Sequence, residues 1–327
     1  MARLPLFLGR AGLTLAMLAT GLPPAWAEGT AHAAARAKLD AAASPASSPW
    51  SSVQLPGTQQ LDLQARKSRH RYRIFLSVPT TPAPAAGHPV LYVLDGNAAF
   101  PVAAFLSRAA ARYSEVSGHA APVVVGIGYT GDADFDVPAR KRDYTVGATR
   151  PELATGEGGA DRFLDFIEHE LKPLIAAKHP VDPKRQALFG HSFGGLFVLH
   201  ALFTRPHAFS TYLASSPSIW WNNKRVLEAL PALQDLARKA DGKPLPRVQI
   251  SVGALEDDPP KGKYSAEKLA MHAARPMVSE ARSVAARLKA QPGWADQVTY
   301  HELAGEDHGA VWLPALSRGM QFFIEQP

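Results

Sequence analysis

The chain has 327 residues, of which 46% are hydrophobic and 20% are charged, a balance typical of a folded globular protein and not of a disordered or fibrous one. It contains no cysteine, which excludes disulfide cross-links, a thiolate nucleophile and cysteine-ligated metal sites. The formal net charge of +6 comes from basic residues scattered along the chain without a basic tract, so nucleic acid is not expected as a partner.

The first residues predict an export signal. Arg3 and Arg10 precede an apolar stretch over about residues 11–22, and small alanines follow it. This order is typical of a signal peptide at residues 1–27, cleaved near Ala27–Glu28. We therefore expect a periplasmic or secreted protein. No later apolar run reaches the roughly 18 residues that a membrane-spanning helix needs.

The segment after the signal changes character near residue 50. Residues 28–50 are rich in Ala, Ser and Pro and are interpreted as a leader or linker, whereas residues 51–327 carry the patterns of one folded domain. The runs at 53–64 and 71–79 favour β-structure and are joined by a polar stretch, so they predict an antiparallel pair of strands.

Farther on, short apolar runs alternate with longer amphipathic segments. The runs are PVLYVLD (89–95), PVVVGIG (122–128), RQALFG (185–190), FSTYLAS (209–215), RVQISVG (247–253) and QVTYHEL (297–303). Several are continuously apolar, as in strands that are covered on both faces. Between them, apolar residues recur every three or four positions over 163–174 and 277–288, which predicts helices. The alternation indicates an α/β fold, with a mostly parallel sheet, helices on both faces and the antiparallel hairpin leading into it.

A serine between two glycines follows the strand at 185–190. The stretch GHSFG (190–194) has the spacing G-x-S-x-G and is followed by the helix-like run GLFVLHALF. A sharp strand-to-helix turn of this kind exposes a serine as a nucleophile at the end of a sheet. We therefore predict that Ser192 is the nucleophile, against the alternative of a small residue in a structural turn. His191 is the variable position of the motif and is assigned no role.

A serine nucleophile of this type is followed in the chain by an acid and then by a histidine. The histidines after Ser192 are His200, His207, His272, His301 and His308. His308 lies in a loop after the last strand, where its side chain can reach back over the end of the sheet, and we predict that it is the general base.

The acid is predicted in the turn after the strand at 247–253. Glu256, three residues beyond that strand, is the first choice and Asp257 the next, whereas Glu306 and Asp307 are too close to His308 in sequence to orient it easily. The alternative is a solvated acidic turn, with a serine–histidine pair acting alone.

An oxyanion hole needs two backbone donors, one from the residue after the nucleophile and one from the loop after an earlier strand. Phe193 supplies the first. The strand at 89–95 runs into Asp95-Gly96-Asn97, where Gly96 permits a bend and the amide of Asn97 is the expected second donor.

These residues resemble a known family. The stretches LDGN (94–97), RKRDYT (140–145), GHSFGGLFVLHAL (190–202), SSPSIWWNN (215–223) and GEDHGAVW (305–312) are similar to the putative-esterase branch of the α/β-hydrolases, and most like the periplasmic ferric-enterobactin and salmochelin esterases. The resemblance runs from about residue 53 to the C-terminus. It implies an α/β-hydrolase catalytic domain over 51–327, hydrolysis of the trilactone of catecholate siderophores, and catalytic roles for Ser192 and His308.

A ferric tris-catecholate is a bulky aromatic trianion, so its pocket needs fixed cations and flat aromatic faces. Expected lining residues are Arg140, Arg142, Tyr144, Trp220 and Trp221. The leading hypothesis is a serine esterase that cleaves a ferric siderophore and releases its iron. A general carboxylesterase, a feruloyl or acetyl esterase and a binding protein without catalysis are alternatives. No cofactor or metal is expected, and the chain is expected to be a monomer.

Overall fold

The computed structural model describes residues 50–235, 244–260, 262 and 264–325. The predicted signal peptide and, apart from its last residue, the predicted leader lie outside these residues. Leu55–Pro327 forms one compact unit, and the description below concerns that unit.

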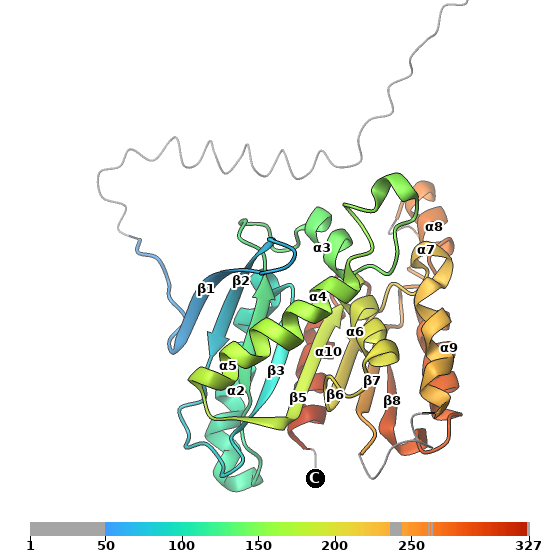
Figure 1. The fold of residues 1–327 in the computed structure, drawn as a ribbon. Helices are drawn as coiled ribbons and strands as arrows, with labels where there is room; N and C mark the ends of the chain where they lie inside the picture. The colour runs from blue at the N-terminus through green and yellow to red at the C-terminus, as the bar shows by residue number, and fades with distance from the viewer. Residues whose placement is uncertain (1–49, 236–243, 261, 263, 326–327) are drawn as a thin grey trace, which may run out of the picture. The chain divides into compact units, whose positions relative to one another are not determined.

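The centre of this unit is an eight-stranded sheet with the order β1-β2-β4-β3-β5-β6-β7-β8 (Figure 1). The strands are β1 (Thr58–Gln64), β2 (Arg71–Ser77), β3 (His88–Leu94), β4 (Val123–Gly128), β5 (Val181–His191), β6 (Thr211–Ser215), β7 (Arg247–Gly253) and β8 (Val298–Leu303). Strand β2 pairs antiparallel with both β1 and β4, and all other pairs are parallel. The predicted hairpin and the predicted mostly parallel sheet are both confirmed.

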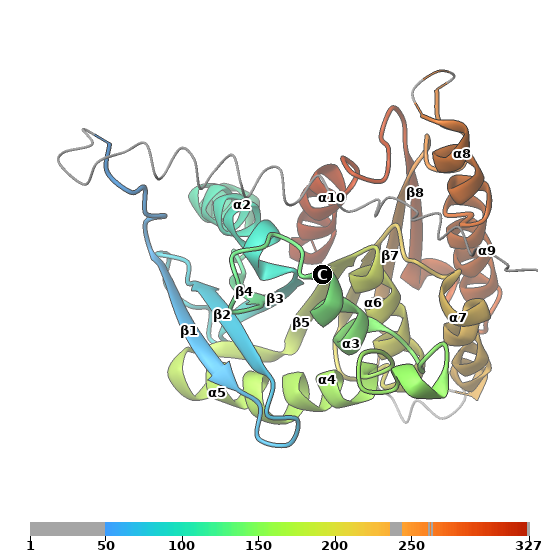
Figure 2. The same ribbon diagram turned by 90° about the horizontal axis from the view of Figure 1, so that it is seen from above.

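Helices cover both faces of the sheet. They are α2 (Gly96–Ser117), α3 (Val137–Tyr144), α4 (Ala160–Phe166), α5 (Lys172–Lys178), α6 (Phe193–Thr204), α7 (Trp221–Lys224), α8 (Ala266–Ala273), α9 (Val278–Lys289) and α10 (Trp312–Ile324). Short 3-10 turns η1 (Pro151–Leu153), η3 (Arg225–Asp235) and η4 (Ala295–Gln297) link them, together with the π-helical turn η2 (Ile167–Leu171). In Figure 2, α2 and α10 lie on one side of the sheet and α4, α5 and α6 on the other.

The two faces have separate hydrophobic cores. Residues from α4, α6 and α9 pack with one face, and residues from α2 and α10 pack with the other. Every residue of β3, β4 and β6 is buried, as the continuous apolar runs predicted. The helix predicted over 163–174 is present, but it passes from α4 through η2 into α5. Among the described residues, no helix combines the length and the apolarity needed to cross a membrane.

The strand pairing decides where a site can form. The register aligns Val93 with Phe189, and Gly190 with Ala214, so the carboxyl ends of β3, β5 and β6 lie side by side. Strands β7 and β8 continue the parallel array. In a parallel sheet the loops after the strands meet at one edge, and this is where such folds place their sites. In Figure 1, α3, α7 and α8 lie at the same end of the sheet.

We predict that the parallel centre of the sheet dominates stability. Leu188 in β5 is fully buried, so Leu188→Ala should lower the free energy of unfolding by about 2–5 kcal/mol through lost burial and the cavity left behind. Leu61 in the edge strand β1 is 46% exposed, and Leu61→Ala should change it by less than about 0.5 kcal/mol. Urea unfolding of both variants measures the difference, and equal losses would contradict this assignment of the core.

Candidate active site

Ser192 stands at the turn between β5 and α6. Its backbone angles are φ 60° and ψ −115°, in the positive-φ region that residues with a Cβ rarely adopt. The Ser192 amide donates to the carbonyl of Ser215 at 2.9 Å, and the Ser192 carbonyl accepts from the amides of Leu196 (2.9 Å) and Ser218 (3.1 Å). Hydrogen bonds from two elements therefore hold the strained turn in place.

Two glycines make this turn sterically possible. A Cβ on Gly190 would lie 2.4 Å from the carbonyl carbon of Gly194, and a Cβ on Gly195 would lie 2.7 Å from the carbonyl oxygen of Ser215. At Gly194 itself a Cβ would make only ordinary contacts, at 3.5 Å or more, with Leu94 and Asp95. The glycine that allows the loop after β6 to approach α6 is therefore Gly195, one residue beyond the predicted motif.

The structure brings His308 to Ser192. Nε2 of His308 lies 3.1 Å from Oγ of Ser192, although the two residues are 116 positions apart in the chain. The loop that carries His308 follows β8, and a carboxylate oxygen of Asp307 accepts hydrogen bonds from the amides of Gly309 and Ala310, both at 3.1 Å. This local turn presents the imidazole over the carboxyl end of the sheet.

Glu256 lies on the other side of the imidazole. Its Oε2 is 2.6 Å from Nδ1 of His308, and its side chain is 1% exposed. Oε1 accepts hydrogen bonds from the amide of Gly253 at 2.7 Å and from the hydroxyl of Ser216 at 2.5 Å. Both carboxylate oxygens are therefore bonded, which fixes the direction in which Glu256 faces the histidine.

Asp257, the second candidate for the acid, has a different position. Its carboxylate accepts hydrogen bonds from the amides of Met277, Val278 and Ser279, at distances from 2.5 to 3.0 Å. These amides begin α9, and the first amides of a helix have no partner within the helix. Asp257 is thus a helix cap and does not contact His308.

Three serines at the end of β6 and in the loop after it also lie at the site, and the sequence analysis gave them no role. Oγ of Ser218 is 3.2 Å from Oγ of Ser192, Ser216 holds Glu256, and Oγ of Ser215 is 3.1 Å from Nδ1 of His191. The SSPS run at 215–218 was visible in the sequence. Its partners were not, because only the sheet order places β6 between β5 and β7.

The predicted oxyanion donors lie at the starts of the two helices that follow the neighbouring strands β3 and β5. Phe193 is the first residue of α6, and Gly96 and Asn97 are the first two of α2. The Asn97 side chain is held by the loop after β4, since its Oδ1 accepts from the Tyr129 amide at 2.8 Å and its Nδ2 donates to the carbonyls of Tyr129 and Gly131 at 3.0 Å. A Cβ on Gly96 would lie 2.9 Å from backbone atoms of β4.

Three of the five predicted pocket residues have other roles. Tyr144 is fully buried and its hydroxyl accepts a hydrogen bond from the amide of Asp95 at 3.2 Å. Arg140 is also buried, with its guanidinium on Asp95, and Arg142 is paired with Asp143 at 2.7 and 2.9 Å. The expectation that Arg140 and Tyr144 face a ligand is therefore wrong, because both are buried, whereas Arg142 is partly exposed with its charge paired to Asp143. Their charges and hydroxyl are used within the protein.

The two predicted tryptophans lie beside Phe193, the residue that follows Ser192. The Phe193 ring packs edge-on against Trp221 at 5.0 Å between centroids and lies 6.0 Å from Trp220. Two cations lie on these indoles, namely Lys141, which belongs to the segment RKRDYT quoted above, and Arg275, to which the sequence analysis gave no role. The guanidinium of Arg275 is 4.5 Å from the Trp220 ring centroid, and Nζ of Lys141 is 5.8 Å from that of Trp221. In the described part of the chain, no ion pair joins either cation to a carboxylate.

His191 packs directly against the site histidine. The rings of His191 and His308 have centroids 4.7 Å apart, and His191 is buried. Burial, with smaller effects of His308 and Arg140, lowers the pKa of His191 well below its usual value, so its ring stays neutral at neutral pH. His191, to which the sequence analysis assigned no role, therefore packs against His308 without adding a second positive charge beside it.

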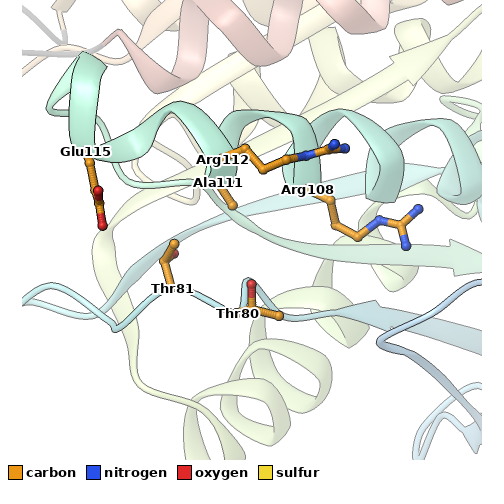
Figure 3. Close-up of a pocket in the computed structure, with 6 residues that line it drawn as sticks. All are labelled: Thr80, Thr81, Arg108, Ala111, Arg112 and Glu115. Carbon is orange, nitrogen blue, oxygen red and sulfur yellow. The ribbon is translucent and has the colours of Figure 1, made fainter.

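A surface pocket of about 590 Å³ lies elsewhere, between α2 and the loop after β2 (Figure 3). It is lined by Thr80, Thr81, Arg108, Ala111, Arg112 and Glu115. None of the predicted site residues contributes to it, so it is separate from the site around Ser192.

Comparison with known proteins agrees with this geometry. The family model described as "Putative esterase" matches residues 66–323. The chain is 36% identical over 278 residues to the ferri-bacillibactin esterase of Bacillus subtilis, covering 83% of this chain and 90% of the relative. It is 37% identical over 252 residues to the siderophore triacetylfusarinine C esterase of Aspergillus fumigatus, covering 72% and 82%.

Solved structures show the same fold. The BES protein from Bacillus cereus superposes with a TM-score of 0.73 and 34% identity, covering 86% of this chain and 99% of that one. The siderophore hydrolase EstB from Aspergillus nidulans gives 0.72 and 34%, covering 84% and 98%. The chain therefore belongs to the putative esterase family, ester hydrolases with the α/β-hydrolase fold.

Proposed function

We propose that the protein is a serine esterase that cleaves the ester bonds of a ferric siderophore and so releases its iron. The observation that carries the catalytic part is the line of contacts Ser192–His308–Glu256, with distances of 3.1 and 2.6 Å. Hydroxyl, imidazole and carboxylate in this order form the arrangement that activates a serine for acyl transfer.

Each group has one task in the proposed reaction. Oγ of Ser192 attacks the ester carbonyl carbon while Nε2 of His308 accepts its proton. The same proton then passes to the leaving alcohol oxygen, which leaves an acyl group on Ser192. Water attacks this acyl-enzyme with His308 again as the base, and the carboxylic acid product departs. Glu256 holds the imidazole with Nδ1–H toward itself and stabilises the cation that forms.

The oxyanion of both tetrahedral intermediates needs amide donors. We assign these to Phe193 and Asn97, with Gly96 permitting the close approach of its helix. First-turn amides have no acceptor within their own helix, and they lie at its positive end. Strands β3 and β5 are neighbours, so the starts of α2 and α6 adjoin the same point of the sheet edge. This placement supports the assignment.

The substrate class is inferred from charge and aromatic surface together with the relatives. The cation–indole pairs Arg275–Trp220 and Lys141–Trp221 border Phe193, the residue next to the nucleophile. A ferric tris-catecholate carries negative charge and flat rings, and such a surface complements both. The Bacillus subtilis relative is named a ferri-bacillibactin esterase and the Aspergillus fumigatus relative a siderophore esterase. We therefore take Trp220 and Trp221 with these cations as the substrate contacts.

Ser192→Ala should abolish acyl-enzyme formation while the fold is kept, because alanine occupies the same turn without the attacking hydroxyl. Stoichiometric labelling by a fluorophosphonate probe, read by intact-protein mass spectrometry, measures this. Ser218→Ala is the matched control, since its hydroxyl lies 3.2 Å from that of Ser192. It should still be labelled. Labelling that survives in Ser192→Ala and is lost in Ser218→Ala would transfer the nucleophile to Ser218.

Glu256→Gln should lower kcat by about 10⁴, because an amide cannot stabilise the imidazolium and favours the wrong tautomer. Asp257→Asn is the control, since that carboxylate caps α9 and should leave kcat close to the wild-type value. Steady-state hydrolysis of one ester by both variants separates the two residues. Near-normal turnover in Glu256→Gln would mean that Ser192 and His308 act as a pair alone.

Salt should depress kcat/KM for a ferric tris-catecholate more than for a neutral short-chain ester, because the Debye length falls from about 10 Å at 0.1 M to about 3 Å at 1 M. Lys141→Gln with Arg275→Gln should flatten that dependence and spare the neutral ester. Arg66→Gln with Arg71→Gln removes the same charge from the exposed hairpin and should not flatten it. Equal salt slopes for both substrates in the wild type would leave a general esterase as the better assignment.

A further inference from the structure

Arg140 joins the two loops that meet at the candidate oxyanion hole. Its Nε donates to Oδ1 of Asp95 at 2.9 Å, and its Nη2 donates to the carbonyl oxygen of His191 at 3.1 Å. Asp95 directly follows β3 and His191 ends β5. The side chains of Arg140 and Asp95 are 8% and 3% exposed, so this bridge is shielded from water.

The backbone of each of these loops is strained at the residue that Arg140 contacts or at the one directly after it. Asp95 has φ 53° and ψ 49°, and Ser192, next to His191, has φ 60°. Residues with a Cβ seldom occupy this region, and such strain persists only where the surroundings enforce it. Directly after each strained residue a helix begins, α2 at Gly96 and α6 at Phe193. The amides assigned to the oxyanion therefore follow the two bridged positions.

We propose that Arg140 is a positioning residue that sets the separation between the two halves of the oxyanion hole. The proposal rests on the proposed function, because it gives Arg140 a task in the same reaction. One planar guanidinium reaches a carboxylate with one nitrogen and a backbone carbonyl with another, and so fixes both loops relative to each other. Lysine carries the same charge on a single nitrogen without this fork.

The assignment explains why a basic residue next to the site is unavailable to a ligand. Burial raises the pKa of Asp95, and the adjacent Arg140 opposes that shift, so the two buried groups depend on each other. Tyr144 also contacts this loop, by accepting a hydrogen bond from the Asp95 amide. Arg140 therefore acts through the geometry of Asp95 and His191 and does not touch the substrate.

The decisive variant is Arg140→Lys, which keeps the charge and removes the two-pronged contact. Loss of one oxyanion donor costs about 10²–10³ in kcat, and a misplaced donor should cost part of that, about 10- to 100-fold. KM for a short-chain ester should change little. A trifluoromethyl ketone, whose adduct carries the oxyanion, should bind more weakly by the same factor as kcat/KM falls. The pH at which activity is half-maximal should not move, since His308 and Glu256 are untouched.

Arg205→Lys is the matched control. Arg205 also forms a two-pronged contact, to Asp165 at 2.6 Å and Glu168 at 2.7 Å, on helices away from Ser192. Its replacement should leave kcat and inhibitor binding unchanged. A second variant, Arg140→Met with Asp95→Asn, removes both buried charges without leaving one unpaired and should show the same loss as Arg140→Lys.

The outcomes separate this proposal from the proposed function. A wild-type protein that hydrolyses no ester and takes up no fluorophosphonate would overturn the proposed function, and the positioning role with it. An active wild type with normal kcat and inhibitor affinity in Arg140→Lys would overturn the positioning role alone. A loss of kcat with unchanged inhibitor affinity, or an equal loss in Arg205→Lys, would also overturn it, since general disturbance of the fold would then explain the effect.

Discussion

Ser192 is held with φ 60° and ψ −115°, and the surrounding structure is arranged to keep it there. A residue in such a sparsely populated φ/ψ region destabilises the fold by about 1–3 kcal/mol, so contacts with the surrounding residues must hold it there. The carbonyl of Ser215, the amide of Ser218 and the close approaches at Gly190 and Gly195 supply them. Because these contacts come from the end of β6 and the loop after it as well as from α6, the pairing of β5 with β6 helps to hold the turn.

The same loop after β6 serves several parts of the site. Ser215, the last residue of β6, contacts both the Ser192 amide and the His191 ring, and in the loop after it Ser216 contacts Glu256 and Ser218 lies beside Ser192. The loop occupies the middle of the strand array, between the strand that carries Ser192 and the strand that leads to Glu256. The loop therefore contacts both Ser192 and Glu256, the two residues that also contact His308.

The buried carboxylates at this site, Glu256 and Asp95, each face a basic side chain. Glu256 faces His308 and accepts two further hydrogen bonds, and Asp95 faces Arg140. Burying a single unpaired charge costs free energy, and pairing and hydrogen-bonding the charged groups reduces this cost and fixes their positions. His191, which could add an unwanted charge, is kept neutral by burial. In the described part of the chain Lys141 and Arg275 form no ion pair, and each lies on an indole ring, Lys141 on Trp221 and Arg275 on Trp220.

The sequence by itself determined the fold class and the order of the main elements. Continuous apolar runs predicted the buried strands, and the spacing in GHSFG predicted a strained serine between β5 and α6, because these signals are local. The order of the chain also predicted Ser192 and His308 as site residues, and it left Glu256 and Asp257 as candidates for the acid.

Tertiary structure alone decided between Glu256 and Asp257, because the two carboxylates are adjacent in sequence and differ only in what they face, His308 or the amides of α9. It also decided the role of the basic segment at 140–142. From the sequence alone, a basic segment of this kind is equally compatible with solvent-exposed cations and with cations that bind a ligand. Only the packing of α3 against the ends of β3 and β5 shows that Arg140 is buried on Asp95 and His191, where its charge is already matched.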